Sequence, residues 1–319
     1  MKISKSIPII ALFLLFAVEL ILRFCFGFCD TVLMVEDQNY EYIAQANQSR
    51  YRFRNQINYN SLSMRSSALD SSSIKILGFG DSVINGGVQT HHNSLATTIL
   101  SDTLSKIKQK NIQFLNISAG SWGPDNCFAY LKKHGNFKAK AIFLFVSSHD
   151  AYDNMQFEKK IIGINKSFPN SQYSLALVEL FDRYLFPILL KKVKVNEKIS
   201  ESQLGINKKT TTTTFNSGFK SFLDYSKDNK IPLIIYLHAD KNELKAVKYN
   251  EQGQKIIEFS KKNEIKIILD LEAGLNATEF RDQIHLNDKG QQKMMERILN
   301  SNSPYFLSKN LNSSILDII

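Results

Sequence analysis

Cysteine is scarce in this chain, which has only three, Cys25, Cys29 and Cys127, among its 319 residues. Three cysteines do not form a disulfide framework, and none of them has the spacing of a metal-ligand motif. Cys127 is typical of a small buried apolar residue. Internal repeats are also lacking, and the length and the 43% hydrophobic content are those of one large globular domain with extensions.

Acidic residues are outnumbered by basic ones, 30 to 40, which gives a formal net charge of +10. A basic excess of this kind favours anionic partners such as lipid headgroups or acidic polysaccharide. The lysines are scattered through helical stretches rather than grouped with aromatic residues. This distribution argues against nucleic acid as a partner.

The first long apolar segment lies close to the N-terminus. Residues Ile7–Phe28 are about as long as a helix that spans a bilayer, roughly 20 residues. Lys2 and Lys5 precede the segment, and Glu19 and Arg23 interrupt it. The two interrupting charges are four residues apart, so they share a helix face and can pair, which lowers the cost of placing them in a membrane.

We predict an uncleaved signal anchor, with residues 1–6 in the cytoplasm, residues 7–28 in the membrane and everything after Asp30 outside. A cleaved signal peptide would use Ile7–Val18 as its apolar core, but no small-x-small cleavage site follows it. A buried helix of a soluble domain would be poorly placed ahead of the polar stretch that comes next. The protein is thus expected in the cell membrane, single-pass, with its main domain extracytoplasmic.

From Ile74 onward, apolar runs of strand length alternate with longer amphipathic stretches. The runs are Ile74–Gly80, Ile112–Ile117, Ala141–Val146, Ile231–Leu237 and Ile265–Leu269. The stretches expected to be helical are Ser94–Lys110, Asn126–His134, Phe215–Asp228, Asn242–Lys262 and Asp288–Leu299. The alternation predicts an α/β domain over residues 74–300, in which a mostly parallel five-stranded sheet is covered by helices on both faces.

The segments at either end of this domain have a different character. Residues 29–73 are polar and lack helical periodicity, but Tyr51–Arg54 and Ile57–Asn60 alternate like two short strands. We expect an extended linker with a hairpin laid against the main domain. The tail, residues 301–319, gives no structural signal.

An insertion at about residues 155–212 separates the third apolar run from the fourth. Within it, Ser174–Phe186 is strongly apolar with a helical pattern, and Pro187 is expected to bend or end that helix. Three lysines and a polar linker that ends at Thr210–Thr214 follow. The helix is interpreted either as a core helix under the insertion or as a surface lid or membrane-docking helix.

Gly80, Asp81 and Ser82 stand where the first apolar run ends. Ligands of open α/β sheets bind at the carboxyl ends of the strands, and a serine there has an exposed hydroxyl beside backbone N–H groups, which suits a nucleophile. An ordinary strand-to-helix turn also explains the tripeptide, because the same residues favour turns and helix N-caps.

Asp282 and His285 follow the fifth apolar run, three residues apart. This spacing places a carboxylate and an imidazole on one turn, where the carboxylate can orient the ring and the ring can take a proton from Ser82. Alone, the pair fits a surface turn or half a metal site as well. Together with the Gly-Asp-Ser turn, it predicts a Ser-His-Asp triad.

In these motifs the chain resembles the SGNH/GDSL hydrolase family, and the resemblance extends from about Asn60 to about Leu299. At its start, Asn60–Arg65 is similar to the lead-in of exported, membrane-attached members. Gly80–Ser82 resembles the nucleophile block and Asp282–His285 the catalytic Asp-x-x-His block. Asn116–Gly120 resembles the glycine block, whose backbone N–H contributes to the oxyanion hole. The resemblance implies a flavodoxin-like three-layer α/β/α sandwich that hydrolyses or transfers acyl esters with no metal and no cofactor.

One block departs from the family pattern. Where the family has Gly-x-Asn-Asp after the third strand, this chain has Ser147–Asp150, with His149 in place of the asparagine. The resemblance implies an oxyanion hole made by the N–H groups of Ser82 and Gly120 and by His149. A neutral imidazole carries one N–H donor, so His149 fills this role if the correct nitrogen faces the oxyanion. Otherwise it is a hydrogen-bonded structural histidine, and the missing donor costs about 10²–10³ in rate.

Four further residues are candidates for substrate binding. His238 ends the fourth apolar run, at the edge of the sheet where the nucleophile lies. Trp122 follows the glycine block and either stacks on a sugar face or packs in the protein. Asp81 and Asp150, which adjoin the nucleophile and the altered block, complete the set.

The predicted function is that of a membrane-anchored, extracytoplasmic serine esterase or acyltransferase. Its expected substrates are O-acyl groups, in particular O-acetyl groups, on cell-envelope or surface polysaccharide, with the membrane as a partner through the N-terminal helix. A catalytically weak carbohydrate-binding or assembly protein is the first alternative, favoured by the altered Ser147–Asp150 block. A lipase-like esterase on membrane lipids, drawing on the apolar Leu175–Phe186 stretch, is the second.

Overall fold

A five-stranded parallel sheet forms the centre of the protein, in a computed structural model that describes residues 6–157, 161–194 and 214–301. Its strands are β5 (Ile74–Gly80), β6 (Ile112–Ser118), β7 (Ala141–Ser147), β8 (Leu233–His238) and β9 (Lys266–Leu269). The strand order is β6-β5-β7-β8-β9, and every neighbouring pair is parallel. This is the flavodoxin-like order, whose direction reverses between the first strand and the third, here β5 and β7. The predicted sheet is confirmed, and it is wholly rather than mostly parallel.

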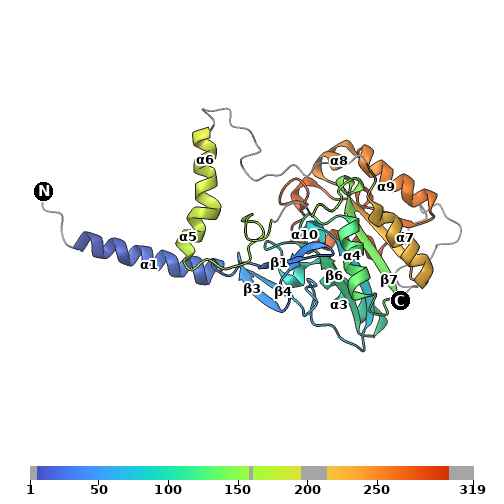
Figure 1. Ribbon diagram of the computed structural model, residues 1–319, viewed down its shortest axis with the longest axis horizontal. Coiled ribbons are helices and arrows are strands. Elements are labelled where there is room, and N and C mark those ends of the chain that lie inside the picture. Colours follow the sequence, from blue (N-terminus) through green and yellow to red (C-terminus); the bar gives the residue numbers. More distant parts are fainter. Residues whose placement is uncertain (1–5, 158–160, 195–213, 302–319) are drawn as a thin grey trace.

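Helices cover both faces of this sheet, as Figure 1 shows. One face carries α3 (Ala96–Lys108) and α10 (Asp288–Leu299), and the other carries α4 (Pro124–His134), α7 (Ser217–Asn229) and α9 (Glu251–Lys262). Successive residues of a strand point to opposite faces. Ile76 of β5 therefore packs in the core with Leu100 and Met294, whereas its neighbour Leu77 packs in the core with Leu131 and Phe219. The predicted three-layer sandwich is confirmed.

The single helix expected over Asn242–Lys262 is wrong, because the chain forms two helices there, α8 (Lys241–Ala246) and α9. Val247 ends α8 in the left-handed conformation, with a φ of 51°. Asn250 then starts α9, and its side chain accepts hydrogen bonds from the N–H groups of the first turn. A left-handed residue followed by an N-cap separates two helices even where the apolar periodicity continues.

Short helical segments follow several strands and hold the polar residues at one edge of the sheet. They are α2 (Ser82–Asn85), η1 (His92–Ser94), η2 (Ser148–Ala151), η5 (Asp270–Ala273) and η6 (Ala277–Glu279). Because the strands are parallel, the segments that directly follow β5, β7 and β9 lie at the same edge, where ligands bind in this class of fold.

Two antiparallel hairpins precede the sandwich: β1 (Met34–Asp37) with β2 (Glu41–Ala44), and β3 (Gln48–Arg52) with β4 (Asn55–Tyr59). The second lies where two short strands are expected, and the first is not predicted. Phe53 and Arg54 join β3 to β4 with φ values of 49° and 67°, which a tight two-residue turn requires. The Asn55 side chain donates to the carbonyl of Val88 at 3.2 Å, so this hairpin is fastened to the main domain.

Helix α1 (Ser6–Phe26) projects from the rest of the protein (Figure 1). Its Pro8–Phe26 segment is long and apolar enough to cross a membrane, by length and composition. Glu19 and Arg23 pair as expected, with 2.9 Å between Oε1 and Nη2. Lys2 and Lys5 lie outside the described residues, as does nearly all of the tail.

A second helical segment, here called the arm, starts beside the C-terminal end of α1 in space. It consists of α5 (Ala176–Leu180), the π-helical η3 (Phe181–Leu185) and α6 (Phe186–Lys194). Of the two effects expected of Pro187, a bend or an end, the helix does not end there, because α6 continues to Lys194. Proline has no N–H to donate, and its ring clashes with the carbonyl one turn earlier in a regular α-helix. The wider π-turn just before Pro187 makes room for the ring. Apolar side chains of the arm are exposed, so the interpretation as a core helix is wrong. The polar linker after the arm lies outside the described residues up to Thr214.

Candidate active site

Ser82 begins the one-turn helix α2 directly after the central strand β5. Asp81 caps this turn, because its Oδ1 accepts a hydrogen bond from the Val83 N–H at 2.8 Å. Gly86 ends the turn with a φ of 70°, in the left-handed region where glycine is favoured. A Cβ at Gly86 would also lie 2.6 Å from the Leu95 side chain. The local sequence therefore folds into a tight turn that places Ser82 at the carboxyl edge of the sheet.

A buried polar network, which the sequence reasoning missed, ties this turn to the neighbouring strand β6. Asn85 donates to both the carbonyl and the hydroxyl of Ser118, each at 3.1 Å. Asn116 donates to the carbonyl of Ile84 at 2.7 Å and accepts from the Ser118 hydroxyl at 2.5 Å. In the sequence, Asn85 is marked only as a polar residue that directly follows the apolar Val83 and Ile84.

Asp282 and His285 lie on one closed turn after β9. Asp282 Oδ1 accepts hydrogen bonds from the N–H groups of Ile284 at 3.0 Å and His285 at 2.8 Å. Partial burial acts to raise the pKa of Asp282, but these two N–H groups and the His285 ring outweigh it and lower the pKa to about 2. The carboxylate is therefore ionised across the whole range in which imidazoles titrate.

One chain of hydrogen bonds joins the predicted triad residues. His285 Nδ1 lies 2.7 Å from Asp282 Oδ2, and His285 Nε2 lies 2.8 Å from Ser82 Oγ. An ionised carboxylate can only accept, so Nδ1 carries a proton, and Nε2 of the neutral ring is left to accept from the Ser82 hydroxyl. This is the tautomer that a general base needs. The structure thus brings the three side chains together, and their catalytic role remains a prediction.

The backbone N–H groups of Ser82 and Gly120 are the candidate oxyanion donors. Within the described ranges, neither N–H donates a hydrogen bond to another protein group. The Gly120 carbonyl accepts from the Tyr42 hydroxyl at 2.8 Å, which orients the peptide after β6. No atom lies within 4 Å of where a Cβ of Gly120 would stand. An N–H without an internal acceptor, next to open space, is available to a developing oxyanion.

Trp122 does not reach the site, so its expected role in sugar binding is wrong. It is 1% exposed, and its ring packs against those of Tyr40 and Tyr130. The indole N–H donates to the carbonyl of Tyr42 at 2.9 Å. Tyr40 and Tyr42 belong to the unpredicted β1–β2 hairpin, and Tyr130 to α4, so the hairpin and this helix enclose the ring.

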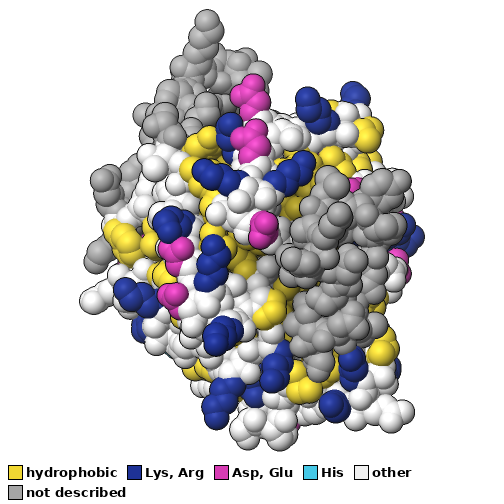
Figure 2. Space-filling model, turned by 90° about the vertical axis from the view of Figure 1, so that its right-hand side faces the viewer, with side chains coloured by type: hydrophobic (Ala, Val, Ile, Leu, Met, Phe, Trp, Pro, Cys, Tyr) yellow, Lys and Arg dark blue, Asp and Glu magenta, His cyan; other side chains and the backbone are white. Residues whose placement is uncertain are grey.

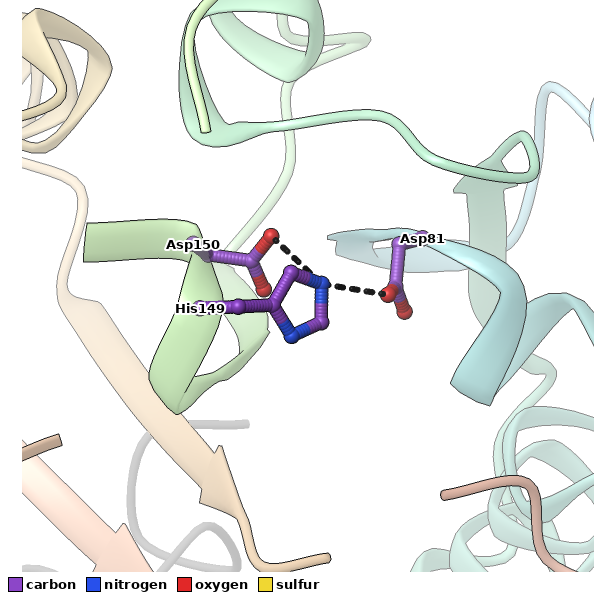
Figure 3. A group of neighbouring side chains, drawn as sticks. All are labelled: Asp81, His149 and Asp150. Atoms are coloured by element: carbon purple, nitrogen blue, oxygen red, sulfur yellow. Dashed lines mark ion pairs between the residues drawn. The ribbon is translucent and has the colours of Figure 1, made fainter. Parts of the chain in front are cut away.

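His149 lies between the carboxylates of Asp81 and Asp150, as Figure 3 shows. Its Nε2 is 3.6 Å from Asp150 Oδ1 and 4.0 Å from Asp81 Oδ2. Burial, opposed by the His149 ring and reinforced by the Asp81 carboxylate, raises the pKa of Asp150 to about 7. Both carboxylates are buried and turned toward His149. They are therefore placed to hold the ring rather than to contact substrate, which corrects the expectation that they bind it.

The tautomer of the His149 ring decides what the ring can donate. Nε2 lies toward two carboxylates, but at 3.6 and 4.0 Å neither oxygen is within hydrogen-bond distance, so these contacts do not by themselves fix the tautomer. A neutral ring with its proton on Nε2 has only a lone pair on Nδ1, which cannot stabilise an oxyanion. Only the imidazolium donates from both nitrogens. In that tautomer, His149 can donate from Nδ1 to an oxyanion only when the ring is protonated.

No protein-family model and no curated protein matches the sequence. Solved structures do resemble the fold. One is a member of the lipolytic G-D-S-L family from Veillonella parvula, at 14% identity over 71% of this chain and 97% of that chain, with a TM-score of 0.39. A second is TesA, at 12% identity over 72% and 98% of the two chains, with a TM-score of 0.43. A third is an acetyl xylan esterase from Geobacillus stearothermophilus, at 11% identity over 72% and 95%, with a TM-score of 0.41.

Likenesses at these identities concern the fold alone.

His238 ends β8 at the edge of the sheet where Ser82 lies, but it is buried beneath the triad turn instead of lining a pocket. Its Nδ1 is 2.5 Å from Asp270 Oδ2, and its Nε2 is 2.7 Å from the carbonyl oxygen of Ile284. Asp270 also accepts from the Tyr236 hydroxyl at 2.6 Å. Sequence reasoning missed Asp270, although a carboxylate directly after β9, beside the end of β8, was a usable signal.

The contacts of His238 determine its charge. Both of its ring nitrogens face acceptors, so both must donate and the ring is an imidazolium. Burial acts to lower the pKa of His238, but the Asp270 carboxylate and the Ile284 carbonyl outweigh it and raise the pKa. His238 therefore holds the turn that carries Asp282 and His285 through one charged hydrogen bond.

We expect Asp270→Asn to lower the free energy of unfolding at pH 6 by about 3–5 kcal/mol, because it leaves His238 as an unpaired buried charge. Since the pKa of His238 is raised in the folded state, its contribution is complete below the ordinary histidine value of about 6.5 and is lost as the pH rises through the folded value. Denaturant unfolding of the full chain in detergent should show this decline for the wild type and not for Asp270→Asn.

The matched control is Asp228→Asn, on the exposed surface of α7. It should keep both the stability and the pH dependence of the wild type. In esterase assays Asp270→Asn should lower kcat more than it raises KM, because the triad turn loosens. Equal stability and equal pH slopes in the two variants would contradict the assignment.

Proposed function

We propose that this protein is a serine-dependent ester hydrolase of the SGNH/GDSL type. Ser82 is the nucleophile, His285 the general base and Asp282 the group that orients it. The observation that carries the proposal is the unbroken hydrogen-bond chain from Asp282 through His285 to Ser82. The Ser82 end of these hydrogen bonds lies beside the point where the strand order reverses between β5 and β7. Open α/β sheets bind ligands at such a point.

The reaction proceeds in two steps. Ser82 Oγ bonds to the ester carbonyl carbon while its proton passes to His285 Nε2. The carbonyl oxygen becomes an oxyanion next to the N–H groups of Ser82 and Gly120, and the imidazolium then gives its proton to the departing alcohol. Water, deprotonated by His285, releases the acid from Ser82. A hydroxyl of a second substrate in place of water would make the same site a transferase.

The openness of the site supports an acyl group carried on a large molecule. The side chain of Asp282 is 52% exposed and that of His285 is 29% exposed. A nucleophile at such an open edge can reach esters that protrude from a polymer. We therefore propose O-acyl esters, in particular O-acetyl esters, of cell-envelope or surface polysaccharide as the substrate class.

The basic surface is consistent with an acidic polymer outside the site. Figure 2 shows the end of the molecule that points away from α1, where Lys and Arg side chains are spread over the face rather than gathered into one patch. A diffuse positive field raises the local concentration of an anionic polymer without specifying its sequence.

Hydrolysis of p-nitrophenyl acetate and of longer-chain p-nitrophenyl esters by the full chain in detergent tests this function. The full chain is needed because the Phe28 ring lies 4.5 Å from the buried Arg52 guanidinium, so removal of the N-terminal segment would expose the domain. We expect release from acetate that depends on Ser82. A preference for long chains would favour the lipase-like alternative, and no Ser82-dependent release from any ester would contradict the proposal.

A catalytically weak carbohydrate-binding protein is the second candidate function. The observation in its favour is that His149, which stands where the family has an asparagine, has its Nε2 turned toward two carboxylates. Binding of acetylated polysaccharide with equal affinity by the wild type and Ser82→Ala, together with no ester release, would identify this function.

We further propose that α1 is a signal anchor and that the catalytic domain lies outside the cytoplasm. The Pro8–Phe26 segment supports this, because it is apolar and almost none of it is buried in the protein. The protein should stay in the membrane fraction after a carbonate wash, with its domain open to protease only from the outer side. Release of a shortened soluble form would instead indicate a cleaved signal peptide.

A further inference from the structure

The helical arm beside α1 presents an apolar face to the outside. From Leu175 to Leu190, every exposed side chain is a large hydrophobic one, between 41% and 54% exposed. These are Leu175, Val178, Phe181, Leu185, Phe186, Ile188 and Leu189. A helix on the surface of a water-soluble domain has the opposite arrangement, with charged and polar residues outward.

The polar side chains of the arm are turned toward the protein. Glu179 is completely buried and pairs with Arg52 at 2.6 Å, and Arg183 contacts the same carboxylate at 3.1 Å. Asp182 pairs with Lys166 at 2.5 Å. The arm is therefore held on the domain by charge pairs, and its apolar face is left without a covering element among the described residues.

The arm is also fastened to α1 by the two charges that interrupt the apolar helix. The Glu19 carboxylate accepts from the N–H groups of Ala176 at 2.8 Å and Leu177 at 2.9 Å, so it caps the start of α5. Arg23 donates to the carbonyl of Ser174 at 2.8 Å. These contacts explain why Glu19 and Arg23 are present in a membrane-type helix, and they make the exposed apolar surfaces of α1 and the arm continuous.

We propose that the arm from Leu175 to Leu190 docks on the lipid surface, with its exposed apolar side chains at the boundary between headgroups and acyl chains. Figure 1 shows α6 running crosswise to α1, so an arm joined to a spanning α1 lies along the bilayer surface. Three of the four residues after Leu190 are lysines, which suit anionic headgroups. The inference rests on the proposed membrane anchor and is independent of the esterase function.

Quenching of introduced tryptophans by labelled lipid tests the proposal. The full chain is placed in vesicles of phosphatidylcholine and phosphatidylglycerol, with some of the lipid brominated on the acyl chain near the headgroup. Leu189→Trp and Val178→Trp report on the arm, Phe13→Trp reports on α1, and Val247→Trp, at a 79% exposed position after α8, is the matched control. The native Trp122 is buried and contributes the same background to every variant.

We expect strong quenching of Phe13→Trp, Val178→Trp and Leu189→Trp and almost none of Val247→Trp. If Phe13→Trp is quenched but both arm variants behave like Val247→Trp, docking is wrong while the anchor stands. A blue-shifted but unquenched emission from the arm would mean that protein, such as a second copy of the chain, covers the face, which also overturns the proposal. Absence of quenching at Phe13→Trp would remove the anchor and the docking together.

Discussion

Ser82→Ala is expected to lower kcat for p-nitrophenyl acetate by about 10⁴–10⁶-fold, with little change in KM. The variant removes the only atom that bonds to the acyl group, while the N–H groups and the surrounding contacts that bind the ester remain. His285→Ala should be about as damaging as Ser82→Ala, and the double variant little worse than either, because members of a triad act as a unit. If the double variant instead shows the product of the two single losses in kcat, the two residues act independently.

A fluorophosphonate probe measures the same prediction without a chosen substrate. The activated Ser82 Oγ bonds to phosphorus and fluoride leaves, so the wild-type protein should be labelled. Ser82→Ala and His285→Ala should not be labelled, whereas Ser221→Ala, which changes a serine on α7, should be labelled like the wild type. Labelling that persists in Ser82→Ala would remove Ser82 from the role of nucleophile.

His149→Ala is expected to lower kcat by about 10²-fold with KM little changed, as loss of one oxyanion donor does. His149→Asn should retain much of the activity, because an amide supplies an N–H without needing a proton from solution. The pH profile should separate the two donors. If the neutral ring keeps its proton on Nε2, Nδ1 donates only from the imidazolium. In that case wild-type activity should fall as the pH rises through the ionisation of His149, and His149→Asn should lack that fall.

Two other roles of His149 give different results. Wild-type activity in His149→Ala would make the residue structural and leave the oxyanion to the N–H groups of Ser82 and Gly120. The three side chains in Figure 3 also each offer one ligand atom, all within 4.8 Å of one another, a spacing that can hold a metal ion. Loss of activity on dialysis against EDTA, restored by a divalent cation, would assign His149 to metal binding instead of hydrogen-bond donation.

The parallel sheet and its order of elements were predictable because they depend on local patterns. A strand buried on both faces needs a continuous apolar run such as Ile74–Gly80, and a covering helix needs a one-sided apolar stripe such as that of α10. The proximity of Ser82 and His285 was predictable for a similar reason. Ser82 and His285 each follow a strand, and parallel strands bring such residues to one edge.

Residues whose role depends on what packs against them were not predictable in this way. Trp122 and His238 have the same sequence signals as site residues, yet one is enclosed by an unpredicted hairpin and the other pairs with Asp270 beneath the triad turn. The arm after Ser174 shows the same limit, since its pattern fits a core helix and a surface helix equally. Glu179 turned inward to Arg52 decides between them.

By itself, therefore, the sequence determined the class of fold, the edge of the sheet where the candidate site lies and the three side chains that meet there, because periodicity and position after a strand are properties of short stretches. Only the tertiary structure decided which nitrogen of His149 faces Asp81 and Asp150, which side chains are enclosed and which face of the arm is outward. Burial and hydrogen-bond partners come from segments far apart in the chain, and no local pattern contains them.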